Sequence, residues 1–382
     1  MIYLDNAATT YPKPAAVSKA VSEAINVFAG NPGRGSHSGS IAASAMLFSY
    51  RNTVASMFGA KPENTVFTYN ATYALNAAIK ASYIYGTHVL ISDLEHNSVL
   101  RPVASVTKST FGGYGIFDSA LNEKYRTDAI ISSIRTKMRP LTRTLVCTAR
   151  SNVCGASMPI RDIGEFCRKN GLFFIVDAAQ AAGFDDIDVE RDSIDVLCVP
   201  GHKGLYGPTG TGALIFSEHG VGCGRIKSFI EGGSGFNSLD IEMPSRLPEM
   251  LEGGTVNLCG AAGLNAGIDF IKSTGLALIR NHETRLTELA AERLCELGGI
   301  TLYRQDRSPI ILFNVDEVSP EQIADMLDQK GICVRSGYHC APLAHKRLGT
   351  PVGGGVRLSV GAFNTCEEIE MFSEVLGKIT KA

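Results

Sequence analysis

The sequence predicts an α/β protein with a mostly parallel sheet between two layers of helices, followed by a smaller α+β domain. Short apolar segments alternate with amphipathic helical patterns between residues 15 and 254. Segments such as FFIVD and DVLCV are apolar throughout, which is typical of strands buried on both faces of a parallel sheet. After residue 254 the pattern changes to a long helical stretch and then to alternating short strands and helices.

The first part of the chain contains the elements of the large sheet. Helices are expected over 15–29, after Pro-Lys-Pro, and over 40–58. Six apolar segments follow, and we expect a strand in each: 64–70, 87–93, 143–152, 172–180, 193–201 and 210–217. A helical pattern at 160–170 lies between two of these segments and gives a βαβ rhythm.

The last part of the chain has a different composition of elements. We expect a helical region over 261–297, a strand in ILFNV, a helix over 319–330, strands in ICVRS and GVRLSV, and a final helix. The predicted domains are a large one over 14–255 and a small one over 256–382, with the N-terminal segment 1–13 joined to the small domain.

Composition excludes several classes of protein. The chain has 382 residues, 45% of them hydrophobic, and a net charge of −2 with acids and bases interspersed, so a nucleic-acid binder is not expected. No apolar run is long enough to span a membrane, and MIYLDNAATT lacks the apolar region of a signal peptide. Ten scattered cysteines without a C-x-x-C pair are typical of a reducing compartment. We therefore expect a cytoplasmic enzyme.

Polar residues cluster where the expected strands end. The clusters are 70–72, 93–96, 151–152, 177–180 and 202–203. Ligands of open α/β sheets bind at the carboxyl ends of the strands, so these five clusters should converge on one crevice.

Lys203 and Asp177 indicate what kind of site this crevice contains. Lys203 follows a strand within the glycine-rich stretch VPGHKGLYGPTGTG; alone, such a lysine most often lies in a solvated loop. Asp177 ends the apolar strand FFIVD, where a carboxylate is costly unless a cation pairs with it. A lysine Schiff base together with an aspartate at a pyridinium nitrogen is the pattern of pyridoxal phosphate sites.

Cys340, in VRSGYHCAPLAHKRLG, allows three interpretations from its own surroundings. It could be a metal ligand with His339 and His345, an activated nucleophile, or an ordinary loop cysteine. The lack of C-x-x-C and H-E-x-x-H patterns weakens the metal hypothesis. The two histidines together with Arg335 and Arg347 give an electropositive setting, which favours a thiolate.

The sequence resembles the class V aminotransferases of pyridoxal phosphate fold type I, and within them the cysteine desulfurases. The resemblance covers nearly the whole chain and rests on these segments: YLDNAATT, NPGRGSH, LEHNSVLRP, SNVCG, VDAAQAAG, PGHKGLYGPTGTG, LEGGTVN, VRSGYHCAPLAH and VRLSVGAFNT. The compact segment around Cys340 is similar to the subgroup with a short active-site loop.

The resemblance implies roles around the cofactor ring. Lys203 would bond covalently to pyridoxal 5′-phosphate, and Asp177 would hold its pyridine nitrogen protonated. Asn152 and Gln180 would hydrogen-bond its phenolic oxygen, and His96 would stack on the ring face and take part in catalysis.

The resemblance also implies how the cofactor phosphate is held. Ala71 and Thr72 would bind it at a helix start, and His202 would add a contact. Thr255 matches a position that reaches the phosphate from a second subunit, which implies a homodimer. Residues 70–73 read Asn-Ala-Thr-Tyr where the family usually has Gly-Thr-Thr-Glu, and Pro200 replaces a phosphate-binding serine, which puts ordinary cofactor affinity in doubt.

The substrate site follows from the same resemblance. Arg357 would bind the substrate carboxylate through both arms of its guanidinium, with Arg335 as a second polar anchor. Asn6 and Ala7 in YLDNAATT are also expected at the substrate. Two further residues border the pocket with no role implied: Arg34 and His37.

The implied activity is that of a cysteine desulfurase, which converts L-cysteine to L-alanine and leaves the sulfur on Cys340 as a persulfide. Three hypotheses stay open beside it: a selenocysteine lyase, a class V aminotransferase or β-lyase that does not use Cys340, and a sulfur-handling regulator that binds the cofactor with little turnover. The expected partners are L-cysteine or L-selenocysteine, a second copy of the chain and an unidentified sulfur-acceptor protein. No metal, nucleic acid or membrane is expected.

Overall fold

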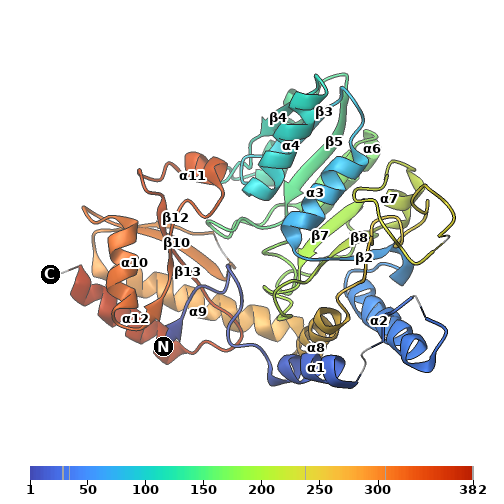
Figure 1. Cartoon of the computed structure of the whole chain (residues 1–382). Helices are drawn as coiled ribbons and strands as arrows, with labels where there is room; N and C mark the ends of the chain where they lie inside the picture. Colours follow the sequence, from blue (N-terminus) through green and yellow to red (C-terminus); the bar gives the residue numbers. More distant parts are fainter. Residues whose placement is uncertain (28–29, 34, 237, 306, 381–382) are drawn as a thin grey trace.

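A seven-stranded sheet forms the centre of the computed structural model, which describes residues 1–27, 30–33, 35–236, 238–305 and 307–380 (Figure 1). Its strand order is β2-β8-β7-β6-β5-β3-β4. The strands are β2 (Thr65–Thr68), β3 (His88–Ser92), β4 (Gly113–Phe117), β5 (Thr142–Thr148), β6 (Phe173–Asp177), β7 (Val196–Pro200) and β8 (Gly212–Phe216). Only β8 runs antiparallel to its neighbours, so the prediction of a mostly parallel sheet is confirmed. Strand β4 was not among the six expected segments, because its Gly-Tyr-Gly start lacks a continuous apolar pattern.

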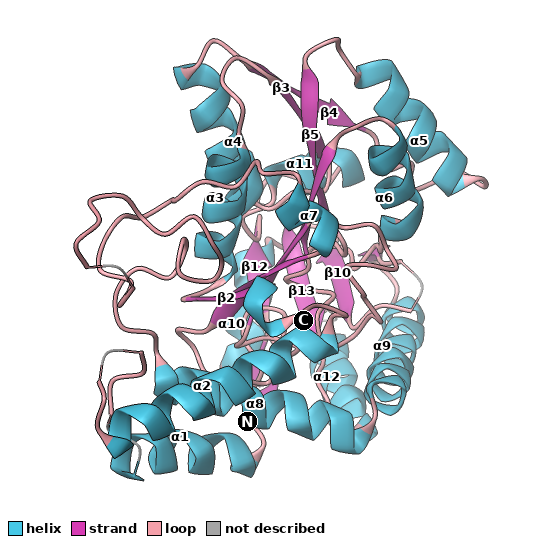
Figure 2. Cartoon of the chain, turned by 90° about the vertical axis from the view of Figure 1, so that its right-hand side faces the viewer, coloured by secondary structure: helices cyan, strands magenta, loops and turns pink. Residues whose placement is uncertain are grey.

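Helices cover both faces of this sheet (Figure 2). They are α3 (Ala71–Ser82) and α4 (Asn97–Ser109) on one face, and α5 (Arg126–Lys137) and α6 (Ile160–Lys169) on the other. Neighbouring strand residues point to opposite faces: Val146 packs in one core cluster with Leu75, and Leu145 packs in the other with Ile163. The continuous apolar strands are therefore explained by burial on both sides.

A second sheet of four antiparallel strands lies beside the first (Figure 1). Its order is β12-β13-β10-β9, and a two-stranded parallel pair, β1-β11, lies next to it. The strands are β1 (Ile2–Tyr3), β9 (Ile300–Tyr303), β10 (Ile310–Val315), β11 (Ile332–Cys333), β12 (Arg335–Gly337) and β13 (Gly355–Ser359). The accompanying helices are α9 (Leu276–Leu297), α10 (Pro320–Asp328), α11 (Pro342–Leu348) and α12 (Cys366–Ile379). The pairing of β1 with β11 holds the chain start against the C-terminal part, while the division at residue 256 stays a prediction.

The remaining helices differ from their expected bounds for local reasons. They are α1 (Ala15–Val27), α2 (Ser38–Met57), η1 (Pro62–Asn64), α7 (Glu218–Gly222) and α8 (Leu258–Thr274). The expected single region at 261–297 is two helices, because Gly275 has a φ of 96° and ends α8. Helix α2 begins two residues early because His37 caps it, its ring nitrogen accepting from the Ser40 N–H. Arg34 and residues 28–29 lie outside the described residues.

None of the helices within the described ranges is long and apolar enough to cross a bilayer.

Candidate active site

The carboxyl ends of the parallel strands enclose a polar pocket that contains most of the predicted cofactor residues. Its empty space is about 490 Å³, counted together with the solvent at its mouth. The lining residues are Asn70, Ala71, Thr72, Leu75, His96, Ser98, Thr148, Arg150, Asn152, Asp177, Ala179, Gln180, Pro200, His202 and Lys203. All five polar clusters predicted at strand ends contribute to this lining: 70–72 and 202–203 in full, and the other three through His96, Asn152, Asp177, Ala179 and Gln180. The expected convergence is confirmed.

Asp177 is buried and Lys203 partly buried in this pocket, and the two act on each other electrostatically. Burial lowers the pKa of Lys203 to about 8, and the negative charge of Asp177 opposes that shift. Burial raises the pKa of Asp177, opposed by a hydrogen bond from the Ala179 N–H at 2.8 Å and by Lys203. A lysine that loses its proton near neutral pH can act as a nucleophile and as a base.

His96 begins helix α4 and is held in one protonation form. Its Nδ1 accepts from the Ser98 N–H at 3.0 Å, so a neutral ring carries its proton on Nε2. Burial, then the charge of Lys203, lowers its pKa to about 4, so the ring is neutral at neutral pH. The Ser98 hydroxyl lies 2.8 Å from both this nitrogen and the Thr72 hydroxyl, and thereby connects the ring to helix α3.

One end of the pocket has the features of an anion site. Helix α3 starts there, and the Asn70 side chain accepts from the Tyr73 N–H at 2.8 Å, leaving the first-turn N–H groups of Ala71 and Thr72 without an intrahelical acceptor. His202 Nδ1 is buried and has no hydrogen-bond partner among the residues described. Asparagine at position 70 therefore replaces the expected glycine as a helix cap.

Asn152 and Gln180 are positioned from both sides of the crevice. Asn152 Nδ2 donates to the His339 carbonyl at 2.8 Å, and its own carbonyl accepts from Arg357 at 3.1 Å. Gln180 Nε2 donates to the Ala7 carbonyl at 2.9 Å. The pocket wall is thus tied to the N-terminal segment and to the small sheet.

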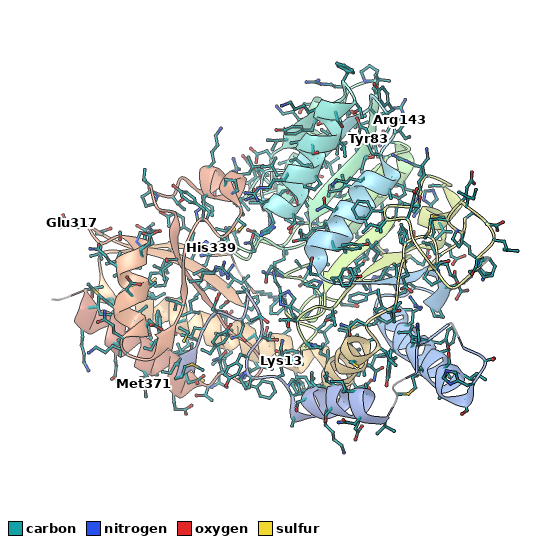
Figure 3. All side chains as sticks on the ribbon, viewed as in Figure 1. Lys13, Tyr83, Arg143, Glu317, His339 and Met371 are labelled. Carbon is teal, nitrogen blue, oxygen red and sulfur yellow. The ribbon has the colours of Figure 1, made fainter. Side chains whose placement is uncertain are left out.

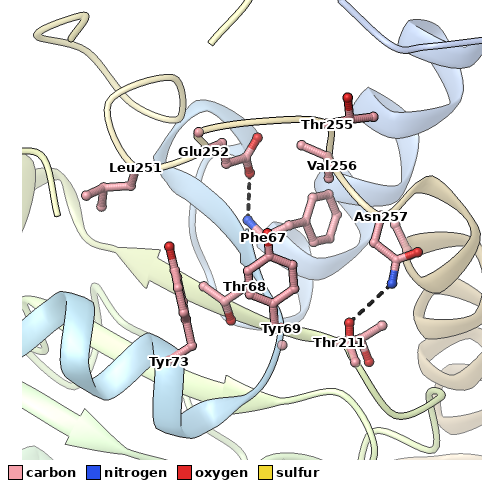
Figure 4. Close-up of a pocket in the computed structure, with 14 residues that line it drawn as sticks. Phe67, Thr68, Tyr69, Tyr73, Thr211, Leu251, Glu252, Thr255, Val256 and Asn257 are labelled. Atoms are coloured by element: carbon pink, nitrogen blue, oxygen red, sulfur yellow. Dashed lines mark hydrogen bonds between the residues drawn. The ribbon is translucent and has the colours of Figure 1, made fainter. Parts of the chain in front are cut away.

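Thr255 is the one predicted cofactor residue that lies outside the pocket of its own chain. It lines a separate hollow with Tyr73 and Thr68, and its hydroxyl accepts from Asn31 Nδ2 at 3.4 Å. Figure 4 shows Thr255 in the segment before α8, with its hydroxyl turned away from Tyr73. Thr255 could therefore contact a cofactor phosphate only in the pocket of another copy of the chain.

The loop that bears Cys340 is fixed against the cofactor pocket. Only residues 338–341 connect β12 to α11, so the loop is short. The Cys340 carbonyl accepts from the Asn97 N–H at 2.7 Å, next to His96, and the preceding carbonyl accepts from Asn152. His339 and Cys340 have φ values of 49° and 55°, a left-handed conformation that costs about 1–2 kcal/mol for each such residue. The exposed Cys340 thiol therefore belongs to a strained, anchored turn beside the pocket.

The charge around Cys340 differs from the sequence-based expectation. His339 and His345 stack on each other, and burial lowers their pKa values to about 3 and about 4, so both are neutral at neutral pH. Arg347 forms ion pairs with Asp93 at 3.5 Å and Asp118 at 2.8 Å. The expectation of four positive groups is wrong for the histidines, because sequence proximity does not reveal burial. Figure 3 shows His339 between the two sheets.

Arg357 is already engaged within the chain. Its Nη2 donates to Asp5 at 2.8 Å and its Nη1 to the Asn152 carbonyl at 3.1 Å, while its buried Nε has no partner in the described part of the structure. Arg335 lies opposite Arg357 in the β12–β13 pairing and is exposed. Arg357, the predicted anchor of the substrate carboxylate, is therefore already paired with a carboxylate of its own chain, a contact that the sequence does not predict.

Asn6 and Ala7 lie behind Lys203, lining a hollow of about 400 Å³ that also touches Gln180. Asn6 Nδ2 donates to the Ser359 carbonyl at 3.2 Å, and the Ala7 N–H donates to the Ser359 hydroxyl at 2.8 Å. These contacts fix the N-terminal segment against β13.

Three contributors to the site were missed by sequence reasoning. They are the Ser98 hydroxyl, the Asn97 N–H and the Asp5 carboxylate. A polar His-Asn-Ser run after a buried strand was the available signal for the first two; Asp5, an acid in the apolar start IYLD, was the signal for the third.

The pocket fits the group that the sequence features imply. Pyridoxal phosphate needs a lysine, an acid at its ring nitrogen and anion donors at its phosphate. The buried and unpaired His202 Nδ1 belongs to the same pocket as the start of helix α3, and a phosphate oxygen would supply its missing partner. Asp177 and Lys203 supply the other two requirements in the same pocket.

Comparisons with known proteins give one result. The model of the family Aminotransferase class-V matches residues 2–372. The chain is 32% identical to a "probable cysteine desulfurase" of Methanothermobacter thermautotrophicus, over 99% of this chain and 94% of the relative. A second protein of that description, from Halalkalibacterium halodurans, is 32% identical over 99% of this chain and 93% of its own length.

Solved structures agree with the sequence relatives. An apo cysteine desulfurase of Thermococcus onnurineus superposes with a TM-score of 0.91 at 32% identity, covering 100% of this chain and 94% of that one. The cysteine desulfurase CsdA of Escherichia coli gives a TM-score of 0.89 at 26% identity, over 99% and 94% of the two chains. The chain belongs to the class V aminotransferase family, and within it to the cysteine desulfurases.

Proposed function

We propose that the protein is a pyridoxal phosphate-dependent cysteine desulfurase, which releases L-alanine from L-cysteine and keeps the sulfur as a persulfide on Cys340. One observation carries this proposal: the Cys340 turn is hydrogen-bonded to Asn97 and to Asn152, and Asn152 lines the same pocket as Lys203. A thiol anchored there can reach the sulfur of a substrate bound in that pocket.

Lys203, Asp177, Asn152, Gln180 and His96 would surround the cofactor ring. When bound, pyridoxal phosphate supplies an electron sink for the electron pair that a substrate Cα retains after losing its proton. The Asp177 carboxylate would face the ring nitrogen, where a positive charge relieves the cost of its burial. His96, neutral with its proton on Nε2, would cover the ring face without adding charge.

The phosphate would occupy the start of helix α3. The N–H groups of Ala71 and Thr72 and the ring of His202 would bind it. Thr255 would complete the site from the partner copy of a homodimer, since its own chain places it in a separate hollow.

Lys203 would move the proton. With a pKa near 8, its Nζ exists partly as a free amine at neutral pH and can take the Cα proton of the substrate. Arg357 and Arg335 would bind the substrate carboxylate, with Asn6 and Ala7 behind them holding the N-terminal segment in place.

Cys340 would then accept the sulfur. Its thiolate attacks the substrate sulfur; an S–S bond forms and the substrate Cβ–S bond breaks, its electron pair staying with carbon. Cβ gains a proton and becomes the methyl group of alanine, so that one thiol and one cysteine give one persulfide and one alanine. The persulfide then passes to an acceptor protein, which the surface charge does not identify.

The test compares Cys340→Ser with the matched control Cys295→Ser, an exposed cysteine on α9. Purified holoenzymes receive L-cysteine and a reductant, while alanine release and persulfide mass are measured. We expect the control to behave as wild type and Cys340→Ser to keep its cofactor absorbance but form no persulfide. Unchanged alanine release by Cys340→Ser would instead support a β-lyase, turnover of a keto acid would support an aminotransferase, and a faster rate on L-selenocysteine would support a selenocysteine lyase.

Lys203→Ala provides the second arm of this test. The variant should bind the cofactor without a covalent bond and release no alanine, because both covalent attachment and proton transfer need Nζ.

All ten cysteines are free, which supports the expected cytoplasmic location; that location stays a prediction.

A further inference from the structure

Two arginines act together on the pocket. Arg335 and Arg357 are directly opposite each other in the antiparallel β12–β13 pair, and such residues project from the same face of a sheet. Burial is the main cause that lowers the pKa values of Arg357 and Lys203, and the positive charge of Arg335 lowers both further, which places Arg335 within electrostatic range of the pocket. The site would thus carry two permanent positive charges for one substrate carboxylate.

Asp5 reduces that charge from inside the protein. Its Oδ1 accepts from Arg357 Nη2 at 2.8 Å, and only 18% of its side chain is exposed. The backbone on both sides of Asp5 is fixed, because the Ser359 N–H donates to Leu4 at 2.7 Å and Ala7 donates to the Ser359 hydroxyl. Asp5 is therefore a built part of the site, and a surface acid free to swing into solvent would not hold this geometry.

The other groups around the arginines do not change this balance. The nearby histidines are neutral at neutral pH, with pKa values lowered by burial to about 4, about 4 and about 3: His96, His202 and His339. Lys203 and Asp177 oppose each other when both are ionised. With Asp5 set against one arginine, a single net positive charge is left for a ligand.

We propose that Asp5 is a specificity-determining residue, which limits the carboxylate site of Arg357 and Arg335 to ligands with one carboxylate. A second carboxylate beside the buried Arg357 would find no cation left to pair with, and an unpaired charge is costly to bury. The inference rests on the proposed function, which makes the two arginines the anchors of an amino acid substrate.

The experiment uses two ligands that differ by one charge and little in shape. Succinate carries two carboxylates and succinamate one, and neither has an amine that could react with the cofactor. Their affinities for the wild-type and Asp5→Asn holoenzymes are measured by calorimetry. In Asp5→Asn the ratio of succinate to succinamate affinity should rise by about tenfold, because one charge-assisted hydrogen bond is made available to the second carboxylate.

Two further variants separate charge from structure. Asp5→Glu keeps the charge and should keep the wild-type ratio, and Asp128→Asn removes an exposed acid on α5 and should also keep it. A ratio in Asp5→Asn within twofold of wild type, or an equal change in Asp5→Glu, overturns the proposal. The wild type alone gives a test if Asp5→Asn does not fold: it should bind succinamate about tenfold more tightly than succinate, and equal binding overturns the proposal.

The result is independent of desulfuration, because neither ligand contains sulfur. If the enzyme releases no alanine from L-cysteine and Asp5→Asn still shifts the ratio, the proposed function fails and the role of Asp5 stands. If alanine is released and the ratio does not move, the function stands and the role of Asp5 fails.

Discussion

Replacing Glu95 with glutamine should remove a loss of stability that the wild-type protein undergoes as pH rises from about 4.5 to about 8. Glu95 is fully buried next to His96. Its Oε1 accepts from the Ser92 hydroxyl at 2.5 Å and from the Thr148 N–H at 2.7 Å, while Oε2 is buried with no hydrogen-bond partner among the described residues. An ionised Glu95 would leave a charge at Oε2 without a donor, facing the charge of Asp177.

The sign and the size of the effect follow from the pKa values. Burial raises the pKa of Glu95 from 4.5 to about 8, so between these values the folded protein holds a proton that the unfolded chain has lost. The stabilisation is complete below the unfolded value and is lost as pH rises through the folded value. At about 1.4 kcal/mol per pH unit, the full loss is about 5 kcal/mol. Glutamine keeps the acceptor at Oε1 and cannot ionise, so its curve lacks this loss.

The assay is urea denaturation of wild type and Glu95→Gln at about pH 5 and about pH 8. At each pH the free energy of unfolding of wild type is subtracted from that of the variant, so that the contributions of all other titrating groups cancel. Because Glu95 is only partly ionised in the folded protein at the higher pH, the variant should gain about 4 kcal/mol of stability over wild type there. Glu288→Gln, an exposed glutamate on α9, serves as the control and should leave the pH dependence unchanged. Parallel curves for wild type and Glu95→Gln would refute the reasoning.

Two further predictions concern contacts away from the cofactor. Glu252→Ala should cost about 3–5 kcal/mol in denaturation, because it leaves the buried Arg51 guanidinium without the carboxylate that its Nη2 contacts at 2.8 Å; a cost below about 1 kcal/mol would contradict this. Asn97→Pro removes the N–H that holds the Cys340 carbonyl at the first position of α4, where proline is tolerated; persulfide formation should fall about tenfold with little change in melting temperature. Asn97→Ala keeps that N–H and should behave as wild type, so equal rates in both variants would argue against the anchor.

The convergence of the site could be predicted from the sequence because it depends on strand ends alone. A buried strand that stops at a polar residue places that residue at the edge of the sheet, and parallel strands share one edge. Asp177 at the end of FFIVD and Lys203 after DVLCVPG could therefore be placed in the same crevice without knowledge of tertiary contacts.

The electrostatics could not be predicted in the same way, because burial and distant partners determine them. His339 looks like a cation beside Cys340 in the sequence, and only the stacked His345 and the surrounding protein make it neutral. Asp5 and Arg357 are separated by more than 350 positions, and their contact depends on how the N-terminal segment lies against β13. Neither fact leaves a local signal in the sequence.

The short turn around Cys340 has a consequence for any acceptor of its sulfur. Residues 338–341 are held between β12 and α11, and the carbonyls of His339 and Cys340 are both bonded to the large sheet side of the crevice. A turn this short, and hydrogen-bonded through both carbonyls, cannot move a persulfide outward from the crevice. Under the proposed function, the acceptor's own thiol would therefore have to enter on a protruding segment, and the ordering entropy of that segment would limit how fast sulfur leaves the enzyme.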